Sequence, residues 1–351
     1  MKVELDIHWR IGLNEARAVD PLLFRLLEAI ERGDNLREAT RSAGVSYRHA
    51  WGLLQQWQDE LGVELVELQR GRGARMLPLG QALLGAARHA RGRLAPTLAS
   101  LAAELEHDLI RLTDQDQPVR ISASHDSALR LLVDHLNVDA PPRFNLQHRG
   151  SLESLRQLAG ERCELAGFHL PEDPPQPAIG ARFRPLVPSG AFELLHFVRR
   201  RQGLILPPGN PRAVRSLADL AAQHVPFINR QPGSGTRLLF DALLTRAEIA
   251  PDAIEGYARE EYTHQAVAAM VASGRAEAGF GIAHAAADFG LDFVPLASER
   301  YLLAFPRRLA DSGWVQRLRA ALDDAGHDPR LTGMPGYDFT DCGQPAGIEA
   351  R

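Results

Sequence analysis

Residues 229–237, AsnArgGlnProGlySerGlyThrArg, hold the groups best suited to bind a ligand. Glycine lets the backbone approach a ligand closely, hydroxyls donate hydrogen bonds, and a guanidinium can bind an oxyanion through two parallel bonds. The loop also precedes a predicted helix, whose first N–H groups lack partners and attract anions. A plain helix cap would need only one hydroxyl. We therefore expect this loop to bind a small anion through Arg230, Ser234, Gly235, Thr236 and Arg237.

Three other predicted strand ends repeat this design of small polar residues followed by a helix. A capping role alone explains any one of them, because Ser, Thr and Asp cap helices in most proteins. His125 and His264 also suit hydrogen-bonded structural imidazoles. If the four helix starts converge, however, they form one anion site with fixed donors. These strand ends add Ser122, Ser124, His125, Asp126, Ser151, Thr263 and His264 to the expected ligand site.

Residue types exclude several enzymatic chemistries. Lys2 is the only lysine in the 351 residues, so neither a Walker P-loop nor a pyridoxal Schiff base can be built. The only cysteines, Cys163 and Cys342, are far apart and lack metal-ligand spacing. His125 and Asp126 are adjacent, and adjacent side chains seldom face each other; no GxSxG or HExxH pattern accompanies them. We predict no enzyme activity, no catalytic residue, no metal and no cofactor.

A different set of residues suits double-stranded DNA. Between Glu67 and Glu104 the chain has several arginines and no acidic residue, which favours a phosphate backbone. Ser46 is predicted to cap the second helix of a helix-turn-helix, whose first residues face base edges, and Arg48 can reach guanine O6 and N7. An ordinary three-helix packing unit is the alternative. The predicted DNA-binding residues are Ser46, Tyr47, Arg48, His49, Trp51, Arg70, Arg72 and Arg75.

Hydrophobic spacing and caps place these DNA-binding residues on a winged helix-turn-helix over residues 1–82. Trp57 is expected in its core. A strand pair with a tip rich in glycine and arginine forms the wing. The predicted helices cover 20–33, 36–43 and 46–61, and the predicted hairpin covers 63–77.

Residues 83–117 are predicted to form a linker helix that pairs with a second copy of the chain. Pro96 is expected to kink or restart this helix. A helix packed only on its own domain is the alternative. Spacings of four, three, four and seven, typical of the seam between paired helices, separate Leu94, Leu98, Leu101, Leu105 and Leu112. We therefore predict a homodimer or a higher homo-oligomer.

Residues 118–351 alternate strands with helices, which predicts parallel βαβ units. Two such sets joined by extended segments are typical of a two-lobed module with a ligand cleft. Lobe I is expected at about 118–198 and 300–351, and lobe II at about 199–299. The predicted fold class is therefore mixed: an all-α winged helix-turn-helix, a linker helix, and a two-lobed α/β module.

Bulk composition is that of a globular protein, with 45% hydrophobic and 24% charged residues. The first residues carry charges, and no run approaches the roughly 20 apolar residues needed to span a bilayer. We expect a cytoplasmic protein that makes no membrane contact.

Residues 20–85 resemble the DNA-binding domain of molybdate-responsive ModE-type regulators and, more loosely, of LysR-type regulators. GlyValSerTyrArgHisAlaTrp at 44–51, the GlyArgGlyAlaArg wing, and LeuProLeuGlyGlnAlaLeuLeu at 77–84 carry this resemblance. Residues 119–305 resemble a periplasmic-binding-protein-like (type II) domain. The residues that carry this second resemblance lie at 201–203, 229–237, 261–267, 272–281 and 299–301.

The resemblance implies a dimeric regulator whose DNA binding responds to a ligand held between two lobes. It suggests a link to molybdenum or tungsten cofactor or formate dehydrogenase metabolism. ModE-type proteins usually carry small β-barrel oxyanion domains, and this sequence predicts none. The ligand is therefore left open among oxyanions of the molybdate or tungstate type, formate or another small carboxylate, and a pterin-type molecule. The alternative function is a cytosolic oxyanion-binding or storage protein without a DNA role.

Overall fold

The computed structural model describes residues 2–33, 36–69, 73–112, 117–138, 141–174 and 176–348. It divides into two compact units, Asp6–Arg91 and Gly92–Arg351 together with Met1–Leu5. The predicted boundary after residue 82 lies too early, because Leu84 and Ala87 are buried in the core of the first unit. None of the described helices is both long and apolar enough to cross a membrane.

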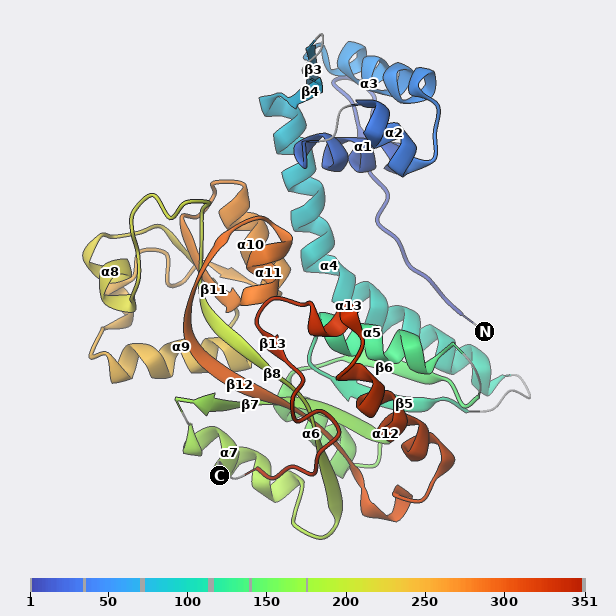
Figure 1. Cartoon of the computed structure of the whole chain (residues 1–351), viewed down its shortest axis with the longest axis vertical. Coiled ribbons are helices and arrows are strands. Elements are labelled where there is room, and N and C mark those ends of the chain that lie inside the picture. Colours follow the sequence, from blue (N-terminus) through green and yellow to red (C-terminus); the bar gives the residue numbers. More distant parts are fainter. Residues whose placement is uncertain are drawn as a thin grey trace. The chain divides into compact units, whose positions relative to one another are not determined.

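The first unit is a winged helix-turn-helix (Figure 1). Ser46 starts the second helix of the motif by accepting a hydrogen bond from the His49 N–H, and Gly62 ends it in the left-handed conformation that glycine favours. Trp57 is buried, as predicted. The elements are β1 (Arg10–Ile11), β2 (Arg17–Ala18), α1 (Pro21–Glu31), α2 (Leu36–Ala43), α3 (Tyr47–Leu61), β3 (Val66–Gln69) and β4 (Gly73–Met76).

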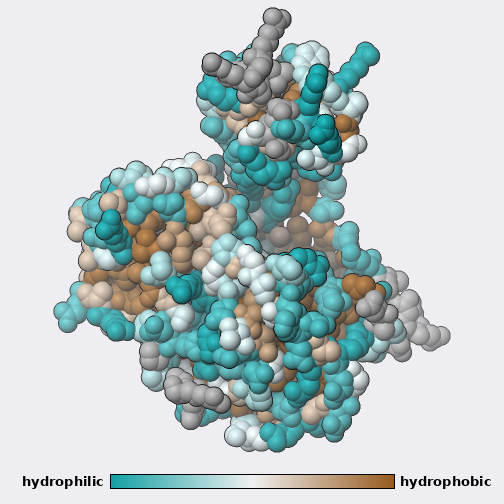
Figure 2. Space-filling model, viewed as in Figure 1, coloured by the Kyte–Doolittle hydropathy of each residue, from teal (hydrophilic) through white to brown (hydrophobic). Residues whose placement is uncertain are grey.

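One detail of this unit differs from the predictions. The wing strands are shorter than the predicted hairpin, because pairing extends only from Val66 opposite Met76 to Gln69 opposite Gly73. The helix α4 (Pro78–Arg111) leads out of this unit and is continuous through Pro96, so the predicted restart is wrong and the predicted kink stays a prediction. Figure 2 shows mainly hydrophilic residues on the visible surface of this unit, whose apolar side chains pack inside.

The second unit holds two lobes built on one sheet, with strand order β10-β9-β11-β8-β12-β7-β5-β6. The strands β5 (Val119–Ala123), β6 (Phe144–His148) and β7 (Leu165–Asp173) are parallel and form lobe I. The other parallel set, in lobe II, is β9 (Phe227–Arg230), β10 (Glu260–Glu261) and β11 (Ala278–Ile282). The predicted two-lobed α/β architecture is thus confirmed.

Two long antiparallel strands, β8 (Phe192–Leu206) and β12 (Asp292–Pro306), run through both lobes (Figure 1). They match the two extended segments predicted to join the lobes. The helices of this unit are α5 (Ser127–Leu136), α6 (Ser151–Ala159), α7 (Pro177–Phe183), α8 (Leu217–Ala222), α9 (Gly235–Arg246), α10 (His264–Ala272), α11 (Ala283–Asp288), α12 (Gly313–Ala325) and α13 (Pro329–Thr332), and β13 (Tyr337–Asp338) pairs with β8.

Candidate functional site

The start of α3 presents the predicted DNA-reading residues to solvent. Ser46, Tyr47, Arg48 and His49 are exposed, and Trp51 is 45% exposed. The opposite side of the helix fills the core with Ala50, Leu53, Leu54 and Trp57. Because the buried side fixes the helix, the outer side chains of its first turns are held on a rigid element and remain accessible to solvent.

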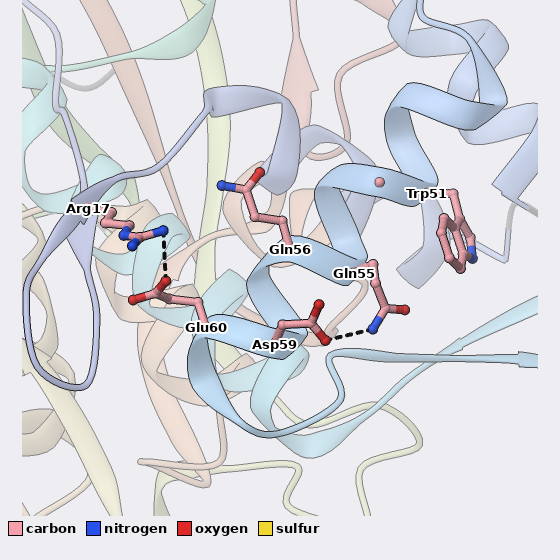
Figure 3. A pocket seen from close by; sticks show the side chains of 7 residues that line it. Arg17, Trp51, Gln55, Gln56, Asp59 and Glu60 are labelled. Atoms are coloured by element: carbon pink, nitrogen blue, oxygen red, sulfur yellow. Dashed lines mark hydrogen bonds and ion pairs between the residues drawn. The ribbon is translucent and has the colours of Figure 1, made fainter.

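The C-terminal half of α3 carries acidic side chains. A groove along α3 is lined by Arg17, Trp51, Gly52, Gln55, Gln56, Asp59 and Glu60, and Figure 3 shows the labelled side chains of the helix with Arg17, from another segment, facing Glu60. Arg17 pairs with Glu60 at 3.1 Å, and Gln55 donates to Asp59 at 2.9 Å. The carboxylates at this end repel phosphate, so any DNA contact of α3 belongs to its first two turns.

The stretch without acidic residues is largely neutralised by partners from elsewhere in the chain. Arg88 contacts Glu28 and Glu31, and Arg91 lies 3.5 Å from Glu28. In the wing, Arg75 donates to Glu67 at 2.8 Å. The expectation that this whole stretch suits phosphate is therefore wrong for Arg88 and Arg91 of the helix α4, which face acidic residues of α1. Arg70 and Arg72, at the wing tip, lie outside the described residues.

In the second unit, polar groups at three strand ends of lobe I meet. The Ser124 and Ser151 hydroxyls are 3.1 Å apart, and Ser151 also accepts the His169 N–H at 3.1 Å. The Tyr301 hydroxyl donates to the Ser124 carbonyl at 2.9 Å, and its ring stacks on His169 at 4.0 Å. The predicted serines thus lie beside two aromatic side chains from β7 and β12.

Lobe II contributes a buried arginine without an acidic partner. Arg230 is 8% exposed and donates to the Tyr262 carbonyl at 2.8 Å and to Gln231 at 3.2 Å. Within the described part of the chain it forms no ion pair. Burial, and then repulsion from Arg200, lower the pKa of Arg230 to about 10. Burial destabilises a cation, and the nearby carboxylates of Glu299 and Glu261 offset only part of that cost, so this arginine is suited to an anion that enters from outside.

Imidazoles from both lobes share the environment of Arg230. Burial lowers the pKa of His264 well below its ordinary value, and the charges of Arg230 and Arg200 lower it further. Burial also lowers the pKa of His125 and of His169, and the charges of Arg230 and Arg200 lower both further. Histidines of both lobes therefore lie near the same two arginines. His264 Nδ1 and His169 Nε2 are buried and have no hydrogen-bond partner among the described residues. Buried polar atoms are normally paired, so these two nitrogens are available to hydrogen-bond a bound ligand or a water molecule.

A network beneath these groups joins the lobes to the crossing strands. Arg200 of β8 contacts the Asp126 carboxylate at 2.7 Å and is also paired with Glu299 of β12. Tyr337 donates to the same Asp126 oxygen at 2.7 Å. The other Asp126 oxygen caps α5 by accepting two N–H groups. All four side chains are buried, so their ion pairs and hydrogen bond hold this part of the second unit rigid.

Several predicted ligand residues have protein partners instead. Arg237 pairs with Asp241 at 3.0 Å, donates to the Arg230 carbonyl and stacks on Tyr257 at 4.0 Å. These contacts occupy Nε and Nη1 of Arg237, so an oxyanion would have to compete with them; the expected two-bond contact stays a prediction. Ser234 caps α9, Asp126 is fully paired, and the buried Ser122 contacts Ser154. Gly235 and Thr236 form the first turn of α9 behind the Ser234 cap.

Sequence reasoning missed the site residues that lie inside strands. These are His169, Arg200, Gln202 and Tyr301. Gln202 is fully buried, and both of its amide atoms lack a partner among the described residues. The available signal was the interruption of apolar strands by polar residues, since a buried polar residue in a strand requires a partner or a function. Among the described residues, no cluster of His, Cys, Asp and Glu is arranged to hold a metal ion.

The buried imidazoles predict that the free protein loses stability in acid. Burial lowers the pKa of His125 to about 4 and that of His148 to about 3. In the unfolded chain both take up a proton near pH 6.5, so the unfolded state binds more protons between that pH and about 4. The free energy of unfolding should therefore fall as pH drops through this window, by up to about 1.4 kcal/mol per pH unit for each of the two imidazoles. Thermal unfolding at pH 7.5, 6 and 4.5 measures this, and a His125→Gln variant should lose less stability than the parent.

A family model described as the PBP superfamily domain matches residues 133–323. The uncharacterized protein YvgK of Bacillus subtilis (strain 168) is 27% identical over 222 residues, 63% of this chain and 71% of that protein. An uncharacterized protein in the 5′ region of a 2Fe-2S ferredoxin gene of Clostridium pasteurianum is 31% identical over 108 residues, 30% of this chain and 96% of that protein. The expected periplasmic-binding-protein-like domain is thus confirmed.

Three solved structures align with most of this chain at low sequence identity. A peroxide-bound OxyR mutant from Corynebacterium glutamicum has a TM-score of 0.45 and 16% identity, covering 89% of this chain and 95% of that chain. Full-length BenM has a TM-score of 0.44 and 17% identity, covering 90% and 98%. CbnR, a LysR family transcriptional regulator, has a TM-score of 0.41 and 18% identity, covering 86% and 98%.

Proposed function

The chain belongs to the PBP superfamily, and we propose that it is a transcriptional regulator that binds double-stranded DNA and responds to a small anion. The N-terminal unit would read DNA, and the two lobes would hold the anion. The observation that carries this proposal is the exposed start of α3 on a buried core. An ordinary packing helix would bury these turns against a neighbour.

DNA contact is proposed for the first two turns of α3. Arg48 is exposed and can offer its guanidinium fork to guanine, and Ser46 marks a helix start that favours phosphate. Tyr47 and Trp51 stand one turn apart and are both about half exposed, which suits apolar contact with a thymine methyl group. The wing arginines Arg70 and Arg72 are proposed to hold phosphate.

A titration of the protein against DNA from its own upstream region tests the proposal. Arg48→Ala should weaken specific binding about 5- to 150-fold, since one good bidentate base contact is worth about 1–3 kcal/mol. Arg25→Ala is the matched control, because Arg25 is an exposed arginine of α1 outside the two helices of the motif. The measurement is fluorescence anisotropy at several salt concentrations, where the parent should bind less tightly as salt rises.

The outcomes of this titration separate the regulator from an oxyanion carrier. A regulator loses DNA affinity in Arg48→Ala, keeps it in Arg25→Ala, and binds anions equally well in both variants. Parent protein that binds anions but shows no salt-sensitive DNA binding would instead be the carrier or storage protein considered above.

The proposed ligand is a small anion held by Arg230 with His169, His264 and the Ser124 and Ser151 hydroxyls. Its candidates are oxyanions of the molybdate or tungstate type, formate and related small ligands, which would link the regulator to molybdenum, tungsten or formate metabolism. Thermal-shift screening against molybdate, tungstate, sulfate, phosphate and formate distinguishes them. A ligand present at 100 times its Kd should add about 2.7 kcal/mol of stability.

A homodimer built on α4 is part of this proposal. The helix buries Ala102, Ala103 and Ile110 in its own unit. It leaves exposed the leucines Leu94, Leu101, Leu105, Leu109 and Leu112. An exposed leucine stripe with the spacing of a helix pair fits a second copy of the same helix. Two recognition helices would then face DNA half-sites about 34 Å apart.

A further inference from the structure

The helix α4 has a gap in its own hydrogen bonding, and lobe II fills it. Pro96 has no N–H, so the carbonyl of Gly92, four residues earlier, loses its helical donor. The Thr263 hydroxyl donates to that carbonyl at 2.7 Å. The same hydroxyl oxygen accepts the Ala266 N–H and caps α10. One side chain therefore completes two helices that are 171 residues apart in sequence.

Gly92 is required for this contact. A Cβ atom at position 92 would lie 3.1 Å from Gln265 Cβ and 3.2 Å from the Ala266 nitrogen. The backbone of α4 thus packs directly on the first turn of α10. The next residue strengthens the contact, because Arg93 stacks on Tyr262 at 5.0 Å and lies 3.9 Å from the Glu261 carboxylate.

One to three turns further along, α4 is attached to lobe I. Ser100 accepts the His148 N–H at 2.8 Å, and Asn145 donates to the Ala103 carbonyl at 2.9 Å. Arg149 lies 3.5 Å from Glu104. Asn145, His148 and Arg149 belong to β6 or follow it directly. The helix is therefore held by lobe II before Pro96 and by lobe I after it.

Both attachments adjoin the candidate anion site. Thr263 directly precedes His264, whose unpartnered nitrogen faces the environment of Arg230. On the other side, His148 packs edge-on against His125 at 5.0 Å. A ligand that changes the distance between the two lobes must therefore strain one of these attachments or bend α4 between them, near Pro96.

We propose that Gly92, Pro96 and Thr263 form a joint through which occupancy of the anion site changes the hold of lobe II on α4, and so reaches the DNA-binding unit that α4 continues into. The signalling role of the joint rests on the proposed function. The contacts that form the joint do not depend on that function. By linkage, DNA that favours one state of the joint must change anion affinity by the same factor.

Two full-length variants test the joint. Gly92→Ala forces the helices apart, and Pro96→Ala supplies an N–H that competes with Thr263 for the Gly92 carbonyl. Thr97→Ala, an exposed change on the same helix, is the control. One readout is hydrogen exchange of the backbone amides at 90–100 and 263–268. The other is the ratio of operator Kd values with and without whichever of the five screened anions stabilises the parent.

In Gly92→Ala, exchange should rise in both segments together, and the ratio should fall to within about twofold of 1 while each ligand still binds. Pro96→Ala should move both readouts in the same direction by less. A parent that responds to the anion together with two variants that respond equally would overturn the joint alone. A parent with no DNA binding or no anion response would overturn the proposed function, and with it the signalling role of the joint.

Discussion

Replacing Arg230 with glutamine is expected to weaken anion binding strongly without lowering the stability of the free protein. Arg230 is a buried cation whose pKa is lowered to about 10, mainly by burial, and it forms no ion pair among the described residues. Removing it takes away an uncompensated charge, which offsets the hydrogen bonds lost to Tyr262 and Gln231. Removing it from the bound state leaves the anion without its charged donor.

The expected loss of affinity is about 30- to 1000-fold, corresponding to about 2–4 kcal/mol for one partner of a buried charge pair. Thermal unfolding with and without the stabilising anion measures the stability of the free and bound protein, and titration calorimetry measures the anion affinity. Arg237→Gln is the matched control from the same loop, and it should keep anion binding because Arg237 is paired with Asp241. Loss of binding in Arg237→Gln but not in Arg230→Gln would show that the site has been assigned to the wrong arginine.

Replacing Arg200 with methionine is expected to cause the largest loss of stability, about 3–5 kcal/mol in the C-terminal unit. Arg200 is paired with Asp126 and Glu299, whose side chains are 0% and 2% exposed. The variant leaves two carboxylates buried without their cation. Chemical denaturation monitored on the full chain measures the effect. Arg199→Met is the control, since Arg199 pairs with Glu172 and Asp341 near the surface and should cost at most about 1 kcal/mol.

The pH dependence identifies the cause of the Arg200→Met defect. An unpaired buried carboxylate has a folded-state pKa raised above its unfolded value, so its penalty is largest at neutral pH and shrinks as pH falls. The stability difference between variant and parent should therefore narrow toward pH 5. Adding Asp126→Asn to the variant should recover part of the loss at pH 7. A difference that stays constant across pH would point to lost packing instead of stranded charge.

Local rules predicted the helix starts correctly. Ser46, Asp126, Ser234 and Thr263 each cap the predicted helix, because a cap is a bond between residues two or three apart in sequence. Strand ends with small polar residues likewise led to Ser124 and Ser151. Such interactions need no knowledge of distant partners. The same reasoning could not tell which cap also faces a ligand.

Charged residues were harder to assign, because their roles depend on partners far along the chain. Arg88 seemed free for DNA until the fold placed Glu31 beside it. Arg237 looked like an anion ligand, yet its helix turns it toward Asp241, whereas Arg230 forms no ion pair among the described residues. Arg200 was overlooked because nothing within its strand reveals that Asp126 and Glu299 will meet it.

The sequence by itself determined the order of elements, the two-lobed plan and the exposed face of α3, because periodicity and capping act over a few residues. Only the tertiary structure decided which polar groups stay unpaired in the site and that Thr263 completes α4 at Gly92. Those outcomes depend on distances between segments brought together by folding. Burial then makes each pairing decisive, since a charge or a carbonyl removed from water must find its partner within the fold.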